Sequence, residues 1–99
     1  MIIMFPTNEN IGLQATLFED FDDAKFYTLI RINQKGAVVS IKSISSNEAK
    51  EISPYAIVSS SKTNNIKYNN TTIFIDETSQ NVDTALVKVL QENLFKKAS

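Results

Sequence analysis

The chain has 99 residues, of which 42% are hydrophobic, and its 10 basic and 11 acidic residues leave a formal net charge of −1. This length predicts a single domain over residues 1–99, with a modest core that dimerisation would supplement. The balanced charge argues against a protein whose main role is to hold nucleic acid or an acidic membrane surface.

The sequence contains no cysteine and no histidine. The isolated chain therefore has no thiolate for catalysis or for an iron–sulfur cluster, and no imidazole for proton transfer or metal ligation. We accordingly expect no bound cofactor and no enzymatic activity. The apolar N-terminus lacks a basic region and a cleavage site, and the longest apolar runs are too short to span a bilayer, so a cytoplasmic protein is expected.

The first part of the chain predicts a strand, then a loop, then a segment that is either helical or extended. Met1–Phe5 is a continuous apolar run, typical of a central strand buried on both faces, and Pro6 is expected to end its ladder. Thr7–Gly12 is polar and rich in turn residues. In Leu13–Phe21 the apolar residues fall at roughly helical spacing, but an extended connection that packs against the sheet explains them equally well.

A β-hairpin is expected next. Lys25–Asn33 is rich in aromatic and β-branched residues, and Ala37–Ile44 alternates in its latter half, with Val39, Ile41 and Ser43 on one face. Between the two strands, Gly36 provides a residue that adopts positive φ without steric cost.

The second part predicts two more strands and a C-terminal helix. A helical turn is expected over residues 45–52, capped by Ser46 or Asn47, and Pro54 stops it. The predicted elements that follow are a strand at Tyr55–Val58, a polar stretch at Ser59–Asn70, a strand at Thr71–Ile75 and a connection at Asp76–Gln80. The helix spans Asn81–Phe95, with Asn81 as N-cap and an apolar stripe formed by Val82, Ala85, Leu86, Val89, Leu90 and Leu94.

This order of elements predicts an α/β fold. A hairpin followed by alternating strands and helices indicates a mixed sheet of five strands with an N-terminal strand, the β-hairpin, helices packed on the sheet and a C-terminal helix.

Several segments resemble the dinitrogenase iron–molybdenum cofactor biosynthesis family, whose members are small accessory domains with a ribonuclease-H-like fold. Residues 2–7 (IIMFPT) are similar to that family's opening strand, which ends in Pro-Thr. Residues 19–27 (EDFDDAKFY) resemble its Glu-His-Phe-Gly-Arg-Ala-Pro-Tyr-Phe segment. Residues 73–75 (IFI) and 81–86 (NVDTAL) resemble its last strand and the start of its last helix. The resemblance implies a ribonuclease-H-like fold and an accessory role.

The chain departs from that family at the positions expected to bind ligand. Asp20, Asp22 and Asp23 stand where the family tends to have histidine, glycine and arginine. Residues 43–54 contain neither glycine nor histidine, although a glycine-rich loop is typical there, and Ser59–Lys62 replaces a second one. Members are thought to hold an iron–sulfur-containing cofactor or its precursor, and this chain offers no thiolate or imidazole for it.

Two polar clusters are candidate sites. Glu19, Asp20, Asp22 and Asp23 supply hard oxygen ligands suited to Mg²⁺ or Ca²⁺, but the spacing fails the calcium-loop pattern and residues 2–5 offer no carboxylate for a two-metal nuclease. A solvated loop is the simpler interpretation. The second cluster, Ser59, Ser60, Ser61 and Lys62, follows a predicted strand, where backbone N–H groups and hydroxyls hold anions in α/β folds, although it lacks the glycines of a phosphate loop.

These observations favour a non-enzymatic accessory or interaction domain with an unidentified protein partner. The first alternative is a protein that binds a small anion or a metal complex in a cleft between the 7–23 and 59–70 loops. The second alternative is a small hydrolase or nuclease that uses the acidic cluster at residues 19–23.

Overall fold

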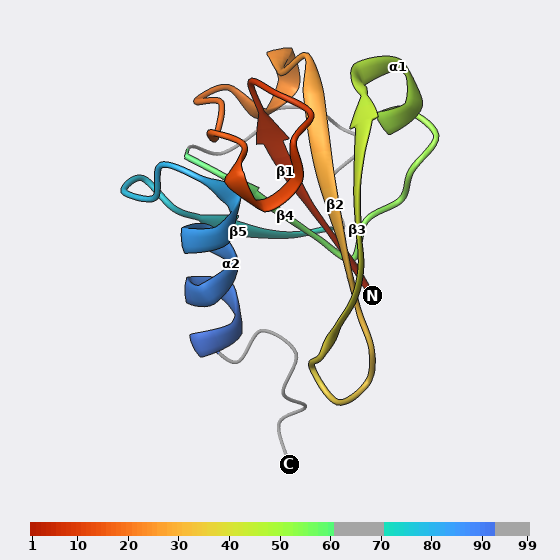
Figure 1. The fold of residues 1–99 in the computed structure, drawn as a ribbon, viewed down its shortest axis with the longest axis vertical. Coiled ribbons are helices and arrows are strands. Elements are labelled where there is room, and N and C mark those ends of the chain that lie inside the picture. Colours follow the sequence, from red (N-terminus) through yellow and green to blue (C-terminus); the bar gives the residue numbers. More distant parts are fainter. Residues whose placement is uncertain (61–70, 93–99) are drawn as a thin grey trace.

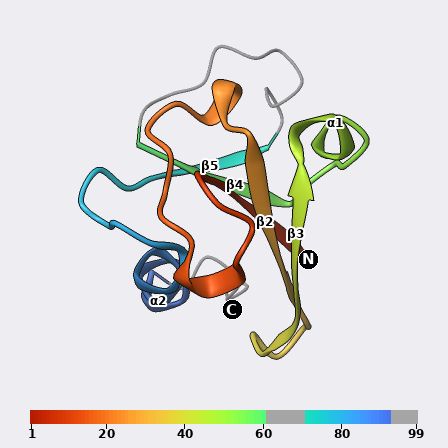
Figure 2. The same ribbon diagram turned by 45° about the horizontal axis from the view of Figure 1, so that its top comes forward.

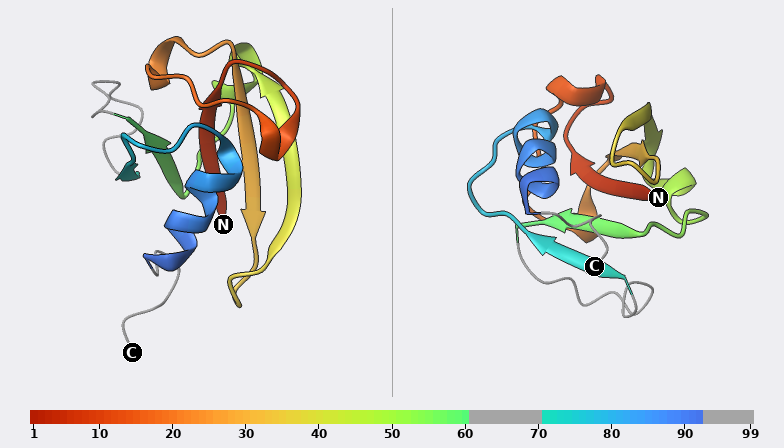
Figure 3. Two further views of the ribbon diagram at one scale, coloured as in Figure 1. Left: turned by 60° about the vertical axis from the view of Figure 1, so that its left-hand side comes forward. Right: turned by 90° about the horizontal axis from the view of Figure 1, so that it is seen from below.

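The computed structural model describes residues 1–60 and 71–92, which form a five-stranded mixed sheet in the order β3-β2-β1-β4-β5 (Figure 1). β2 is antiparallel to both β1 and β3, whereas β4 is parallel to β1 and β5 (Figure 3). The α/β fold with a mixed five-stranded sheet that the sequence predicted is thereby confirmed. In chain order the elements are β1 (Ile2–Thr7), η1 (Gly12–Gln14), η2 (Phe21–Asp23), β2 (Phe26–Ile32), β3 (Val38–Ser45), α1 (Ser46–Ala49), β4 (Ala56–Ser59), β5 (Thr72–Ile75) and α2 (Val82–Gln91).

The sheet buries apolar side chains on both faces. Successive strand residues point to opposite sides, so Ile3 and Phe5 of β1 pack toward α2, while Met4 packs toward the face that α1 and η2 cover. All three side chains are fully buried. This arrangement confirms the prediction that the first strand is central and covered on both faces.

The prediction that Pro6 ends this strand was wrong. β1 continues through Pro6 to Thr7, and Pro6 pairs with Tyr27. Ile32 donates its N–H to the Met1 carbonyl, so odd-numbered residues of β1 form the hydrogen-bonded pairs with β2. The nitrogen of Pro6 therefore points away from β2, and its missing N–H leaves that ladder intact.

The hairpin has the predicted strands and turn. Asn33 accepts hydrogen bonds at Oδ1 from the N–H groups of Lys35 and Ala37, and Gly36 has φ of +84°. Pairing of Ile30 with Ile41 places the Ile41 side chain on the α2 face, as the alternation predicted. The hairpin extends beyond the rest of the sheet at the bottom of Figure 1.

The connection from β1 to β2 contains no long helix. It consists of the 3-10 turns η1 and η2 joined by extended residues, so the extended alternative is the correct one. Its apolar residues serve both cores, because Leu13 and Leu17 pack on the α2 side and Phe18 and Phe21 on the other. Figure 2 shows η1 beside the start of α2, where Val82 donates its N–H to a loop carbonyl.

Both α-helices found in the described residues begin at side-chain caps. The cap of α1 is Ser45 rather than the expected Ser46 or Asn47, and Ser45 and Glu48 form a reciprocal capping box. The cap of α2 is Asn81, as predicted, and the buried stripe Val82, Ala85, Leu86 and Val89 faces the sheet. The predicted stripe residue Leu94 lies outside the described residues, and none of the helices in residues 1–60 and 71–92 is long and apolar enough to cross a bilayer.

Candidate functional site

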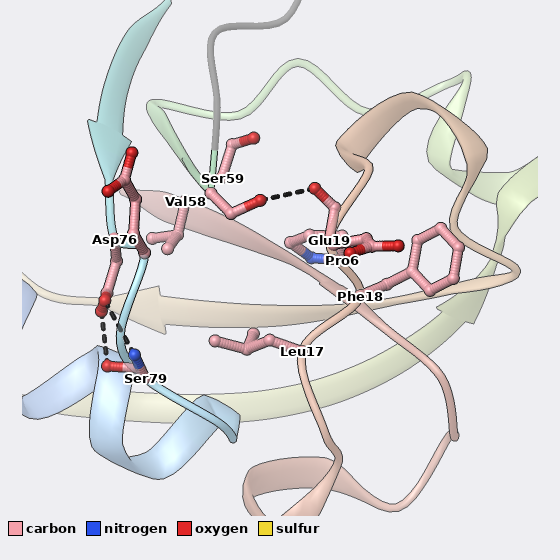
Figure 4. Close-up of a pocket in the computed structure, with 10 residues that line it drawn as sticks. Pro6, Leu17, Phe18, Glu19, Val58, Ser59, Asp76 and Ser79 are labelled. Carbon is pink, nitrogen blue, oxygen red and sulfur yellow. Dashed lines mark hydrogen bonds between the residues drawn. The ribbon is translucent and has the colours of Figure 1, made fainter.

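A cavity of about 130 Å³ lies at the carboxyl ends of β1, β4 and β5. Ends of parallel strands are the usual location of ligand sites in open α/β sheets. Its lining comes from four separate stretches of the sequence, which Figure 4 shows around one hollow. The lining residues are Pro6, Leu17, Phe18, Glu19, Val58, Ser59, Ser60, Asp76, Glu77 and Ser79.

The cavity brings together described residues of the two loops singled out from the sequence. Ser60 donates a hydrogen bond from Oγ to the Glu19 carbonyl oxygen at 2.5 Å, across 41 positions of the chain. Ser59 is buried at the end of β4 and its carbonyl accepts the N–H of Asp76. Of the predicted serine and lysine cluster, Ser59 and Ser60 thus line the cavity, whereas residues 61 and 62 lie outside the described residues.

The floor of the cavity is apolar and its rim is acidic. Leu17 and Val58 belong to the core on the α2 side, and Figure 4 shows them between Glu19 on one side and the Asp76–Ser79 segment on the other. Three carboxylate residues line the cavity, and two of them, Glu19 and Glu77, are exposed. Coulomb's law makes such a rim unfavourable for an anion and favourable for a cation.

The third carboxylate, Asp76, is buried and held by several hydrogen bonds. Its Oδ1 accepts the N–H groups of Thr78 and Ser79 at 3.0 Å each, and its Oδ2 accepts the Ser79 hydroxyl at 2.5 Å. Lys88 Nζ lies 3.5 Å from Oδ1 and also donates to the Thr78 hydroxyl. Asp76 therefore fixes the connection between β5 and α2.

Burial alone would raise the pKa of Asp76, but the hydrogen bonds from Ser79 and Thr78, together with the Lys88 ammonium, outweigh burial and lower it. Asp76 is accordingly ionised at neutral pH. A carboxyl held in this way is poorly placed to act as a general acid or base near neutrality.

The sequence prediction treated Asp76–Gln80 as a plain connection and missed this role. The available signal was an aspartate followed by threonine and serine at the second and third positions, just before a helix. Such side chains favour short turns in which the carboxylate accepts nearby backbone N–H groups.

The predicted metal cluster is divided between two locations. Glu19 lines the cavity, whereas Asp20 caps the turn η2 by accepting the N–H of Asp22 at 3.0 Å. The negative charge of Asp20 and a hydrogen bond to it raise the pKa of Asp23. Within residues 1–60 and 71–92, three or more carboxylates do not gather anywhere at metal-binding distance. Metal binding at Glu19, Asp20, Asp22 and Asp23 stays a prediction.

An iron–sulfur-containing cofactor does not fit the donors of this chain. Such clusters are held by thiolates and in some cases imidazoles, and the full sequence contains neither cysteine nor histidine. The rim carboxylates would also repel a negatively charged cluster.

Comparison with known proteins identifies the fold. No protein-family model and no curated protein sequence matches the chain. Among solved structures, a Methanocaldococcus jannaschii protein provisionally named a dinitrogenase is similar with a TM-score of 0.70 and 19% identity, covering 93% of this chain and 89% of that one. The protein PH0822 is similar with a TM-score of 0.68 and 12% identity, covering 91% and 88%. A Thermotoga protein provisionally named NifB, of the DUF35 family, has a TM-score of 0.60 and 9% identity, covering 99% and 97%.

The chain has the fold of these proteins. The coverage is nearly complete in both directions, so the similarity extends to the whole domain rather than to a shared sheet alone. The fold expected from the sequence resemblance is thereby supported, and at identities of 9 to 19% the similarity concerns the fold.

Proposed function

We propose that this chain is a non-enzymatic accessory domain of the cofactor-assembly type that acts by binding a partner. Two provisionally named structural neighbours, a dinitrogenase and a NifB protein, support the association with cofactor assembly. The absence of cysteine and histidine from the sequence supports a role in recognition rather than in holding a cluster. The ordered, ionised state of Asp76 supports binding over proton transfer.

The observation that carries the proposal is the cavity between Glu19 and Asp76, with its apolar floor and acidic rim. A volume of about 130 Å³ is far below the ~300–1,000 Å³ of ordinary ligand pockets and is close to the ~150 Å³ of a cavity that holds one benzene ring. The cavity therefore suits a single side chain or a fragment of that size.

The chemistry of the lining selects a short alkyl chain that ends in an ammonium group. An alkyl stem contacts the apolar floor at Leu17 and Val58, and the charged end meets the carboxylates of Glu19 and Glu77. A lysine side chain of a partner protein has this chemistry, and so does a free primary amine. The small-anion alternative from the sequence is disfavoured by the same carboxylates.

Isothermal titration with propylammonium, and in parallel with phosphate, tests this proposal. We expect binding of propylammonium, with the amine recovered chemically unchanged, and no binding of phosphate. Glu19→Gln and Glu77→Gln should each weaken the affinity roughly two- to fivefold, as expected for an exposed ion pair. Glu51→Gln, which removes the same charge from an exposed residue outside the cavity lining, is the matched control. Binding of phosphate alone would contradict the proposal.

A further inference from the structure

Within residues 1–60 and 71–92, β3 is an outer strand of the sheet with one open edge, because among these residues it pairs only with β2. Figure 3 shows β3 at the edge of the sheet away from α2. Residues 38–42 form a continuous exposed run. Its apolar members Val38, Val39 and Ile41 are 39%, 54% and 42% exposed, which is unusual for three β-branched residues so close together.

The hydrogen-bond register shows which backbone groups point outward. Ser46 donates its N–H to the Lys25 carbonyl at 3.1 Å, so Ser46 and Lys25 are a hydrogen-bonded pair. In an antiparallel ladder such pairs alternate with pairs that are not hydrogen-bonded, so the even-numbered residues of β3 direct their backbone groups toward β2. Ile41 and Ser43 fall in the other pairs and direct their N–H and C=O groups away from β2. The N–H of Ser45, which also points outward, meets a Glu48 carboxylate oxygen at 3.5 Å, and this contact ends the open row.

The edge carries few of the devices that usually prevent pairing between edges. Natural edge strands are commonly protected by several charges, proline, a short length or a bulge in the middle. β3 has eight residues, no proline and Lys42 as its one charged side chain, and its irregular pairing lies at the turn end, near Ile32. The opposite edge strand, β5, has only four residues.

We propose that β3 pairs antiparallel with β3 of a second copy of this chain, about a two-fold axis at Ile41. Ile41 then forms a reciprocal pair of N–H to C=O bonds with its own equivalent, and the two five-stranded sheets become one continuous sheet. This inference concerns a surface separate from the cavity and does not depend on the proposed function.

Charge and shape of the strand favour a second copy as the occupant. The axis at Ile41 places Lys42 opposite Ser40 of the partner subunit, so the single charge of each strand does not oppose its equivalent. Isoleucine meets isoleucine at the centre of the pair. Gly12 of η1 lies close to the Ile41 side chain, so its neighbour Ile11, which is 60% exposed, adds apolar surface beside the same strand.

Sedimentation equilibrium on the full chain from micromolar to millimolar concentration tests the proposal. We expect the mass to double with concentration. Ile41→Lys and Ile41→Glu should each weaken self-association at least roughly tenfold, because each variant opposes like charges at the axis. An equimolar mixture of the two variants should recover the dimer, because opposite charges then meet. Val87→Lys, at a similarly exposed valine of α2, is the control that should still dimerise.

A cysteine at the axis gives a second readout that also works if a charged variant folds poorly. The chain has no native cysteine, so the single thiol of Ile41→Cys forms an intermolecular disulfide under mild oxidation if the strands pair as proposed. Directly paired residues lie about 5.5 Å apart between Cα atoms, inside the range for a disulfide. Val87→Cys should remain largely monomeric. A chain that stays monomeric throughout, or a dimer unaffected by both charged variants, overturns the proposal, as does crosslinking of the two cysteine variants to equal extents.

Discussion

The hydroxyl of Ser60 donates to the carbonyl oxygen of Glu19 at 2.5 Å and so joins the residue that follows β4 to the loop that follows β1. These two segments meet at one side of the cavity, and the Asp76–Ser79 segment lies on the other (Figure 4). Their junction lies where the parallel strands β1 and β4 end, which is why two loops distant in the sequence share one site.

The Ser60 hydroxyl should contribute to stability and to the shape of the cavity. Ser60→Ala removes the hydrogen bond to the Glu19 carbonyl, with an expected loss of about 0.5–1.5 kcal/mol in the free energy of unfolding. Urea unfolding measures the change, and the propylammonium affinity should fall in parallel. Ser53→Ala, at an exposed serine outside both the cavity lining and β3, is the matched control. Equal stability of the two variants would show that the junction contributes nothing.

Asp76 should stabilise the fold in a pH-dependent way. Asp76→Ala removes an ionised side chain that accepts several hydrogen bonds, and we expect a loss of about 2–3 kcal/mol at pH 7. The pKa of Asp76 is lowered by folding, so its stabilising contribution is complete above the ordinary value of 3.8 and disappears as the pH falls through the folded value.

Urea unfolding of the wild type and the Asp76→Ala variant at a series of pH values tests whether folding lowers the pKa of Asp76. The stability difference should be constant from neutral pH down to about pH 5 and should shrink below pH 4. Glu51→Ala, at an exposed carboxylate, is the matched control and should cost little stability at neutral pH. A difference that grows on acidification would mean that folding raises the pKa of Asp76 instead.

Thr28 and Thr7 form a natural pair for comparison, because both are fully buried. The Thr28 hydroxyl is the buried side-chain group without a hydrogen-bond partner in the described part of the chain, whereas Thr7 Oγ1 donates to the Glu9 carbonyl at 2.8 Å. Thr28→Val should leave stability unchanged or raise it by up to about 1 kcal/mol. Thr7→Val should lower it by about 1 kcal/mol. Thermal unfolding of both variants measures the two changes in stability. A larger loss for Thr28→Val than for Thr7→Val would refute the assignment of Thr28 as the residue with the unpaired hydroxyl.

Gly36 should be required by its backbone conformation rather than by space. An added Cβ would meet nothing within 4 Å, so Gly36→Ala tests only the cost of φ at +84°. We expect a loss of about 1 kcal/mol, and a smaller one for Gly36→Asn, because asparagine tolerates this conformation better. Chemical denaturation of the two variants provides the comparison. Equal stability of Gly36→Ala and the wild type would exclude a conformational requirement.

The sequence predicted the elements whose signals are local. The hairpin was found because β-branched runs flank Gly36, and α2 because Asn81 precedes an apolar stripe of helical period. The end of β1 was misplaced because the effect of Pro6 depends on the direction of its nitrogen within the sheet, and this direction follows from the pairing with Tyr27. A single strand gives no information on that pairing.

The candidate site was predicted only in part, because it too depends on how distant segments come together in the fold. Ser59 and Glu19 were found because they are polar residues near predicted strand ends. Leu17 and Val58 look like ordinary core residues in the sequence, and their place on the floor follows from three strands ending together. The role of Asp76 depends on a turn that brings Ser79 back to it, which composition alone does not indicate.

Chemical-shift mapping of propylammonium on the ¹⁵N-labelled chain tests the central claim most directly. The account predicts saturable shifts of the backbone amides around the cavity, at Leu17, Ser60 and Glu77, with the hairpin amide of Lys35 unaffected. Phosphate at the same concentration should leave the cavity amides in place. Shifts at the cavity with phosphate alone, or no saturable shift at these amides with the amine, would contradict it.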